Sequence, residues 1–393
     1  MLLKYLLHLC LALLVLGQFT RFSRGEFSLY ISDIAVLSFG LVGFIFFILK
    51  KNLYVSYSFL LYTIFILYCL VTLFLKFEVY SINQLLVAAS YIVRLASYLG
   101  AAVVVSNMLR NNYLNKTELL NILIFYSLAF AFFGFIQYII LPDFSTLDPK
   151  LGWDPHKYRL TGTFFDPNFA GAFIVLGLLA LLFKIDTKKS LNFNDFLIGF
   201  SLLSAILLTY SRSAWLMLAA IIFILGFKYK EILVFSLFIF FAAYLAVPRI
   251  QTRLSGTTDP ADSAHFRLIS WKNAYSIYSD NKMFGVGFNA YRYAQNQEKF
   301  LNDTNFEGNS GAGADSSFLL VLATTGVIGF ILFLVSYLFP IVESQAGIYV
   351  FALLFSLALN TQFINSLFYP QILFYMFILI EIFSNQLNLR KLL

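Results

Sequence analysis

Charged residues are scarce in this chain. Only 12% of its 393 residues are charged, whereas a soluble domain carries about 25%. Together with a hydrophobic majority, this excludes a soluble enzyme and a disordered protein. Cysteine is also rare, at two residues, which excludes a disulfide-stapled secreted module. Cys10 and Cys69 both lie in apolar stretches without metal-ligand spacing, so we expect buried thiols.

Hydrophobic residues make up 60% of the chain, and 47 of them are phenylalanine. A helix needs about 20 apolar residues to cross the hydrocarbon core of a bilayer. Apolar runs near this length predict an all-α polytopic integral membrane protein with about twelve transmembrane helices. The runs lie at 2–19, 27–49, 53–75, 82–105, 119–141, 168–183, 195–211, 213–227, 231–247, 316–338, 345–362 and 366–385. The seventh and eighth runs are short for full crossings, and a re-entrant pair is the alternative.

The basic residues indicate how these helices are oriented. The net charge is +7, but Lys and Arg gather in short connections between apolar runs, which favours cytoplasmic anchoring over a nucleic-acid partner. Their excess in one set of connections favours both termini in the cytoplasm. We therefore expect transmembrane helices 1–9 in residues 1–248, a large periplasmic loop with short amphipathic helices in 249–314, and helices 10–12 in 315–393. A second long outer connection covers 142–167.

Arg94 lies in the middle of an apolar run, where a charge costs several kcal/mol. Small and polar residues share its helical stripe, so it should face protein or a water-filled cavity. Two interpretations remain open. Arg94 binds substrate, or it is a structural arginine paired with Asp33 or Glu381.

Two further arginines are placed where they can reach an anion at the outer face. Arg212 lies at the tip between two short apolar runs, beside hydroxyl residues that can cap a helix, an arrangement that suits phosphate. Arg267 shares a helical face with Trp271 and Tyr278, opposite Lys272, so it should point inward. For both arginines the alternative is an interfacial residue that snorkels to lipid headgroups or contacts an aromatic ring.

Polar residues at helix starts complete the set of candidates. Arg159 precedes a segment in which Asp166 and a proline predict a helix N-cap. Asp315 opens the run after the long loop, either as an N-cap or as a general base. His156 and His265 are expected to be solvated surface residues.

These residues predict several arginines converging near one acid at the outer face. The sequence contains no metal-ligand cluster, no Asp-x-Asp pair and no P-loop, so no metal and no cofactor is expected. Convergent arginines favour a substrate with phosphate oxygens. Because ATP is not available outside the cytoplasm, a lipid-linked phosphate is the natural candidate.

Five short stretches, in this order and spacing, resemble the O-antigen ligase/polymerase superfamily, which includes WaaL-type ligases and Wzy-type polymerases. They are Arg159…Gly162-Thr163-Phe164…Pro167-Asn168, Thr209-Tyr210-Ser211-Arg212-Ser213-Ala214, Arg267…Trp271-Lys272-Asn273-Ala274, Gly285-Val286-Gly287 and Ser317-Phe318-Leu319…Thr325-Gly326-Val327-Ile328-Gly329. The resemblance implies a GT-C-like glycosyltransferase of the bacterial inner membrane, acting at the periplasmic face without a metal and with inversion. Its partners would be an undecaprenyl-diphosphate-linked oligosaccharide, membrane lipids and a chain-length regulator protein.

The resemblance also implies roles for individual residues. Arg212 and Arg267 would hold the diphosphate, with Arg159 and Arg253 in support. Trp271 and Tyr278 could stack on sugars. Ligases usually carry a His-Asn pair where this chain has Asp315-Ser316, so the departure favours a polymerase. A ligase that transfers glycan to lipid A-core and a transporter of lipid-linked sugar remain the alternatives.

Overall fold

The protein is a helical bundle crowned at one end by shorter helices. The structure, a computed structural model, describes residues 1–24, 27–147, 154–226, 234, 238, 241–242, 244–255, 263–301, 313–344, 347–384 and 389–391. The helices of the bundle are α1 (Leu2–Leu16), α2 (Ile31–Leu49), α3 (Tyr57–Phe74), α4 (Ile82–Arg110), α5 (Lys116–Ile140), α6 (Pro167–Lys188), α7 (Phe193–Leu208), α8 (Arg212–Gly226), α14 (Ser317–Glu343), α15 (Ile348–Asn360) and α16 (Pro370–Phe383). The crowning helices are α10 (Pro248–Ser255), α11 (Ser263–Asp280) and α12 (Tyr291–Gln297).

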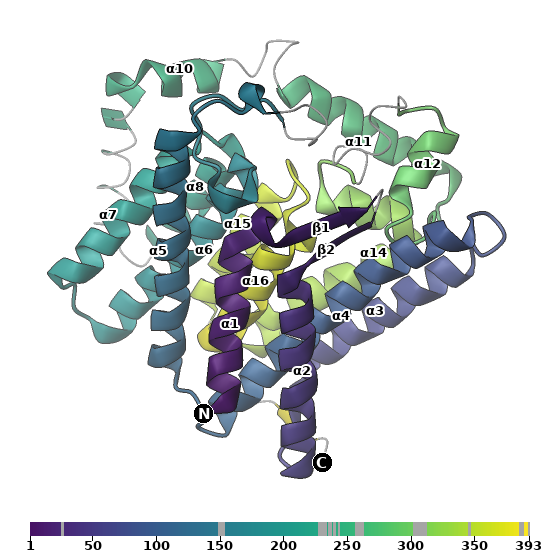
Figure 1. Cartoon of the computed structure of the whole chain (residues 1–393), viewed down its shortest axis with the longest axis horizontal. Helices are drawn as coiled ribbons and strands as arrows, with labels where there is room; N and C mark the ends of the chain where they lie inside the picture. The colour runs from purple at the N-terminus through teal and green to yellow at the C-terminus, as the bar shows by residue number, and fades with distance from the viewer. Residues whose placement is uncertain are drawn as a thin grey trace.

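The expected all-α polytopic membrane fold is confirmed. Seven helices of the described chain are long and apolar enough to cross a membrane, and α7, α8, α15 and α16 are shorter apolar helices. The predicted ninth span, 231–247, lies largely outside the described residues. Both termini lie at one end of the bundle, whereas α10, α11 and α12 lie at the other (Figure 1). The latter end is called the outer end below.

Strand structure is confined to two short antiparallel pairs in the part of the chain that the structure covers. β1 (Arg21–Arg24) pairs antiparallel with β2 (Phe27–Tyr30) between α1 and α2. β3 (Tyr54–Ser56) pairs antiparallel with β4 (Leu389–Lys391), and this pairing joins the start of α3 to the C-terminal segment. Short 3₁₀ turns occur at η1 (Gly17–Thr20), η2 (Phe144–Thr146), η4 (Gly162–Phe164) and η7 (Ser366–Phe368).

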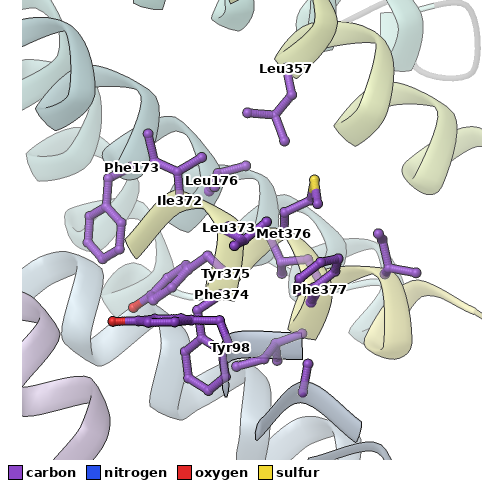
Figure 2. Close-up of a cluster of buried hydrophobic side chains, with 14 of the residues drawn as sticks. Tyr98, Phe173, Leu176, Leu357, Ile372, Leu373, Phe374, Tyr375, Met376 and Phe377 are labelled. Atoms are coloured by element: carbon purple, nitrogen blue, oxygen red, sulfur yellow. The ribbon is translucent and has the colours of Figure 1, made fainter. Parts of the chain in front are cut away.

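The core is built around α16. Every residue of this helix is buried, unlike a helix at the edge of a membrane bundle, which keeps one face on lipid. Tyr98, Phe173 and Leu357 approach it from three other helices (Figure 2). Tyr375 packs against Phe173, with 4.4 Å between ring centroids and the ring planes tilted by 55°, and it donates a hydrogen bond to Leu123 O at 3.1 Å. Because α16 is packed on all sides, it holds the surrounding helices in place. The ends of several of these helices carry the outer site.

A break in α14 holds the outer helices in place. Gly326 interrupts the helix with φ 66° and ψ −171°, a backbone conformation open mainly to glycine. The segment 282–287 lies against this break. Val286 N donates to Ala323 O at 3.0 Å, and Val327 N donates to Lys282 O at 2.8 Å. These backbone bonds form a junction, called the 282–287 junction below.

Glycine is required on both sides of this junction. A Cβ at Gly285, whose φ is +68°, would lie 2.3 Å from Thr324 C. A Cβ at Gly326 would lie 2.3 Å from Met283 C. The Gly-Val-Gly and Thr-Gly-Val stretches that carry the family resemblance therefore have a structural role, since their glycines allow the two backbones to approach closely.

Candidate functional site

Loops and helix ends from distant parts of the chain meet at the outer end of the bundle. The α7–α8 turn approaches the start of α6, where Ser211 Oγ donates to Asn168 Oδ1 at 2.8 Å. The start of α8 reaches α10 through Arg212 Nη1, which donates to Arg253 O at 3.2 Å. The start of α14 is joined to α11, because Asp315 N donates to Ser270 Oγ at 3.0 Å. Three helix N-termini, which attract anions, thus lie in one region.

Arg159 is a deeply enclosed arginine of this region. Its Nε donates to Thr209 O at 2.8 Å and its Nη2 to Tyr210 O at 3.2 Å. Burial lowers the pKa of this guanidinium to about 9, with a further contribution from Arg253. Arg159 therefore stays charged at neutral pH, but at a cost that a bound anion would relieve.

Arg249 and Arg253 reach the site from α10. Arg249 Nη1 donates to Tyr158 O at 2.6 Å, and its Nη2 donates to Lys157 O. The same guanidinium lies 4.3 Å from the ring centroid of Tyr210. Arg249 was not among the predicted site residues. Its spacing of four residues from Arg253 could have indicated it, because this spacing places both arginines on one face of a short helix.

Arg267 lies on α11 and faces the same group of charges. Its charge acts on Arg159, Asp166 and Asp315. Lys272 on the same helix is exposed, as the helical projection predicted. The face that carries Arg267 is thus turned toward the other arginines.

Two aromatic residues of α11 contact the start of α14 and the residues packed beneath α11. Trp271 Nε1 donates to Asp315 O at 3.3 Å, and its ring lies 5.8 Å from that of Phe363. Tyr278 is half-buried against the small core beneath α11. Both remain predicted sugar-stacking residues, and both also have a packing role here.

Two carboxylates of the site belong to Asp166 and Asp315. Asp166 caps α6 as expected, since its Oδ1 accepts from Asn168 N at 2.6 Å and from Phe169 N at 3.2 Å. Burial raises the pKa of Asp166. Burial also raises the pKa of Asp315 to about 6, against the opposing effect of Arg267. Asp315 is consequently mostly ionised at pH 7 yet protonated in mild acid.

His156 lies inside the site, so the expectation of a solvated surface residue is wrong for it. Only 13% of its side chain is exposed, and its Nε2 lies 3.9 Å from Asp154 Oδ2. One donor atom each from Asp154, His156 and Asp166 fall within 4.8 Å of one another. Sequence spacing did not predict this grouping, because a loop must fold back to bring the first two residues to the start of α6. His265, in contrast, is exposed as expected.

These three residues are also the described group best suited to hold a metal ion. However, Arg159 and Arg253 both lower the pKa of His156, which means that their positive charges act at the same point. Nearby cations oppose the binding of a divalent ion. The arrangement therefore suits an anion and a proton better than a metal.

Arg94 has a partner of its own on α2. Its Nη2 is 2.8 Å from Asp33 Oδ2, and its side chain is only 12% exposed. Arg94 also donates to Ser28 O, and Tyr98 donates to the second oxygen of Asp33 at 3.2 Å. The geometry favours the structural alternative, an ion pair between α2 and α4, and a substrate-binding role for Arg94 stays a prediction.

Comparison with protein families places this region in a known group. The family model described as O-antigen ligase matches residues 197–334. This match covers about a third of the chain and supports the O-antigen ligase/polymerase superfamily. A search of curated proteins finds no match.

The superfamily match covers only part of the site. Arg212, Arg253, Arg267 and Asp315 all lie within the matched residues. Arg159, Asp166 and the His156 segment precede it, yet they face the same point. The outer site is therefore assembled from the matched region and from the loop between α5 and α6. The family supports a glycosyltransferase-like activity on lipid-linked polysaccharide in a multi-pass membrane protein.

Proposed function

We propose that the chain is a polymerase of O-antigen or a similar surface polysaccharide. It transfers the growing glycan from undecaprenyl diphosphate to a hydroxyl on the non-reducing sugar of another lipid-linked repeat unit. The protein lies in the bacterial inner membrane with this site facing the periplasm. The predicted division into helices 1–9, a periplasmic loop and helices 10–12 belongs to the same proposal.

One observation carries the proposal, namely how the arginines are held. Arg159 and Arg249 donate to backbone carbonyls, which fix the guanidinium groups without cancelling their charge. With Arg212, Arg253 and Arg267 nearby, the region concentrates positive charge that a diphosphate would neutralise. Guanidinium groups suit phosphate oxygens because they can donate two parallel hydrogen bonds.

The proposed reaction is a direct displacement at the anomeric carbon of the donor. The acceptor oxygen forms a bond to this carbon, the bond to the phosphate oxygen breaks, and the configuration inverts. The electron pair leaves with undecaprenyl diphosphate, whose growing charge the arginines stabilise. Asp315 takes the proton of the acceptor hydroxyl, and no metal or cofactor is required.

A ligase is the second candidate, since the matching family model is described as O-antigen ligase. Asp315-Ser316, in place of the His-Asn pair that the resemblance associates with ligases, favours the polymerase. The chain-length regulator stays a prediction that no contact here supports.

Reconstitution of the purified protein separates the candidates. The protein is given its undecaprenyl-diphosphate-linked repeat unit alone, without metal, nucleotide or lipid A-core. A ladder of lengthened lipid-linked products is the expected result. Transfer only after addition of lipid A-core would instead identify a ligase. No product in either mixture, with repeat unit moved across the vesicle membrane, would identify a transporter.

A further inference from the structure

His156 is held rigidly inside the arginine-rich site. Its segment is fixed by backbone bonds, from Phe144 N to His156 O at 2.8 Å and from His156 N to Asp154 O at 2.7 Å. The Nε2 atom of the ring is buried and has no hydrogen-bond partner within the described residues. The ring thus has one nitrogen available inside the site.

Opposing charges face this ring from three parts of the chain. Arg159 on its own segment and Arg253 on α10 disfavour a proton on the ring, whereas Asp154 favours it. The carboxylate of Asp166, at the start of α6, belongs to the same group of donor atoms within 4.8 Å. Burial and the arginines dominate, and they lower the pKa of His156 to about 4. The ring is neutral at pH 7 while the arginines carry no anion.

We propose that His156 takes up a proton when the donor diphosphate binds, and then serves as a further cation and hydrogen-bond donor for that diphosphate. This inference rests on the proposed function, because it needs a diphosphate on Arg159 and Arg253. A bound diphosphate neutralises the two charges that keep the ring neutral. Asp154 and Asp166 then stabilise the imidazolium. The proton comes from solvent and returns to it when the diphosphate leaves.

The consequence is a site whose positive charge increases only when it is occupied. A further fixed cation would raise the burial cost of the empty site, as the lowered pKa of Arg159 already indicates. A titrating histidine avoids this cost, because it becomes charged only in the presence of the compensating anion.

Histidine-selective NMR in detergent tests the proposal directly. The chain has three histidines, so the signal of His156 can be assigned from the variant His156→Gln. The matched control is His265→Gln, since His265 is exposed on α11. The probe is dimethyl diphosphate with one methyl group on each phosphorus, a diester without a titrating proton in the neutral range. EDTA is present throughout, so that a metal cannot mediate the effect.

We expect the probe to raise the pKa of His156 from about 4 by roughly three units, which is about a thousandfold gain in proton affinity and brings the ring into the neutral range. The signals of His8 and His265 should not move. Probe affinity should also fall between pH 4.5 and pH 7.5 in the parent protein (roughly the range through which the ring would lose its proton). The fall should be shallower in His156→Gln, where carboxyls of raised pKa such as Asp315 still titrate.

The failures of the two proposals can be told apart. Binding of the probe, seen by phosphorus NMR and lost in Arg267→Ala, without a shift of His156 would overturn the inference and leave the proposed function standing. Equal pH dependence of affinity in the parent and His156→Gln would overturn it as well. Absence of any probe binding would contradict both the arginine site and the role of His156.

Discussion

Among single residues, the arginines of the outer site and Arg94 show two ways of holding a guanidinium. Arg94 is neutralised by a carboxylate, at 2.8 Å from Asp33, and so contributes a rigid link between two helices. Arg159 donates to the carbonyls at the end of α7, where the helix dipole favours a cation. Only the second arrangement leaves charge for a ligand, which is why the two arginines are expected to respond differently to substitution.

Arg267→Ala is expected to abolish long-chain product while the protein still inserts into the membrane. Loss of one preorganised donor to the leaving group typically costs about 2.7–4 kcal/mol in the barrier, or roughly 10²–10³ in rate. The measurement is product length on a gel together with the amount of protein in the membrane. Lys272→Ala, on the exposed side of the same helix, is the control and should leave product length unchanged. Normal chain lengths from Arg267→Ala would remove it from the site.

Asp315 should make the reaction sensitive to acid. As a general base it must be ionised, and its pKa is raised to about 6, chiefly by burial. The rate should therefore fall about tenfold per pH unit below pH 6, and Asp315→Asn should abolish this dependence with most of the activity. A parent rate that is flat from pH 7 to pH 5 would contradict the assignment.

The same shift predicts an effect on stability that does not depend on catalysis. A carboxyl whose pKa is raised on folding stabilises the native state at low pH, and this contribution is lost as the pH rises through the folded value. Asp315→Asn removes the buried charge. We expect its unfolding temperature to exceed that of the parent at pH 8 and to approach the parent value near pH 4. A lower value at both pH values would instead indicate a structural role for the carboxylate.

Among secondary-structure elements, the break in α14 determines where α11 lies. The 282–287 junction ties the end of α11 to the middle of α14, and Ser270 and Trp271 tie its centre to the start of α14. Because α11 carries Arg267, the position of this charge depends on backbone contacts well away from it.

Gly326→Ala and Gly285→Ala test this dependence. Each introduces a Cβ that meets backbone at 2.3 Å, at a residue with positive φ. The strain alone costs about 1–3 kcal/mol, so a lower unfolding temperature and loss of polymer are expected. Gly199→Ala in α7 is the control, since its Cβ would meet only Leu181 Cδ2 at 3.5 Å. Parent-like activity in both junction variants would show that the junction does not position the site.

In the molecule as a whole, sequence patterns predict the positions of the helices well and the tertiary contacts between loops poorly. Runs of apolar residues fix where helices form, because a bilayer demands a minimum length. The arginines at 159, 212, 253 and 267 could be predicted to converge, since each lies in or beside a connection that the sequence places at the outer face. The position of His156 could not, because it depends on the bridge between Asp143 and Lys157, a tertiary contact without a local signal.

Orientation in the membrane can be tested on the whole chain with single cysteines. Cys10 and Cys69 are both buried, so the parent protein should react little with a membrane-impermeant maleimide. Lys272→Cys, exposed at the outer end, should be labelled in spheroplasts. Thr187→Cys, exposed at the opposite end of α6, should be labelled only after lysis. The reverse pattern would place the site in the cytoplasm and contradict the proposed use of a periplasmic substrate.

Arg249 donates hydrogen bonds to the main-chain carbonyls of Lys157 and Tyr158, and this affects which substitutions the protein tolerates there. Both side chains are exposed, so replacing them leaves the accepting oxygens in place. A substitution scan should therefore find both positions more tolerant of side-chain exchange than of a change in main-chain path, apart from the ion pair of Lys157 with Asp143 and the positive φ of Tyr158 (48°). Deletion of one residue here, or Tyr158→Pro, should disturb the site where side-chain exchange does not. Proline removes the bond from Tyr158 N to Pro142 O and cannot adopt the positive φ of this position.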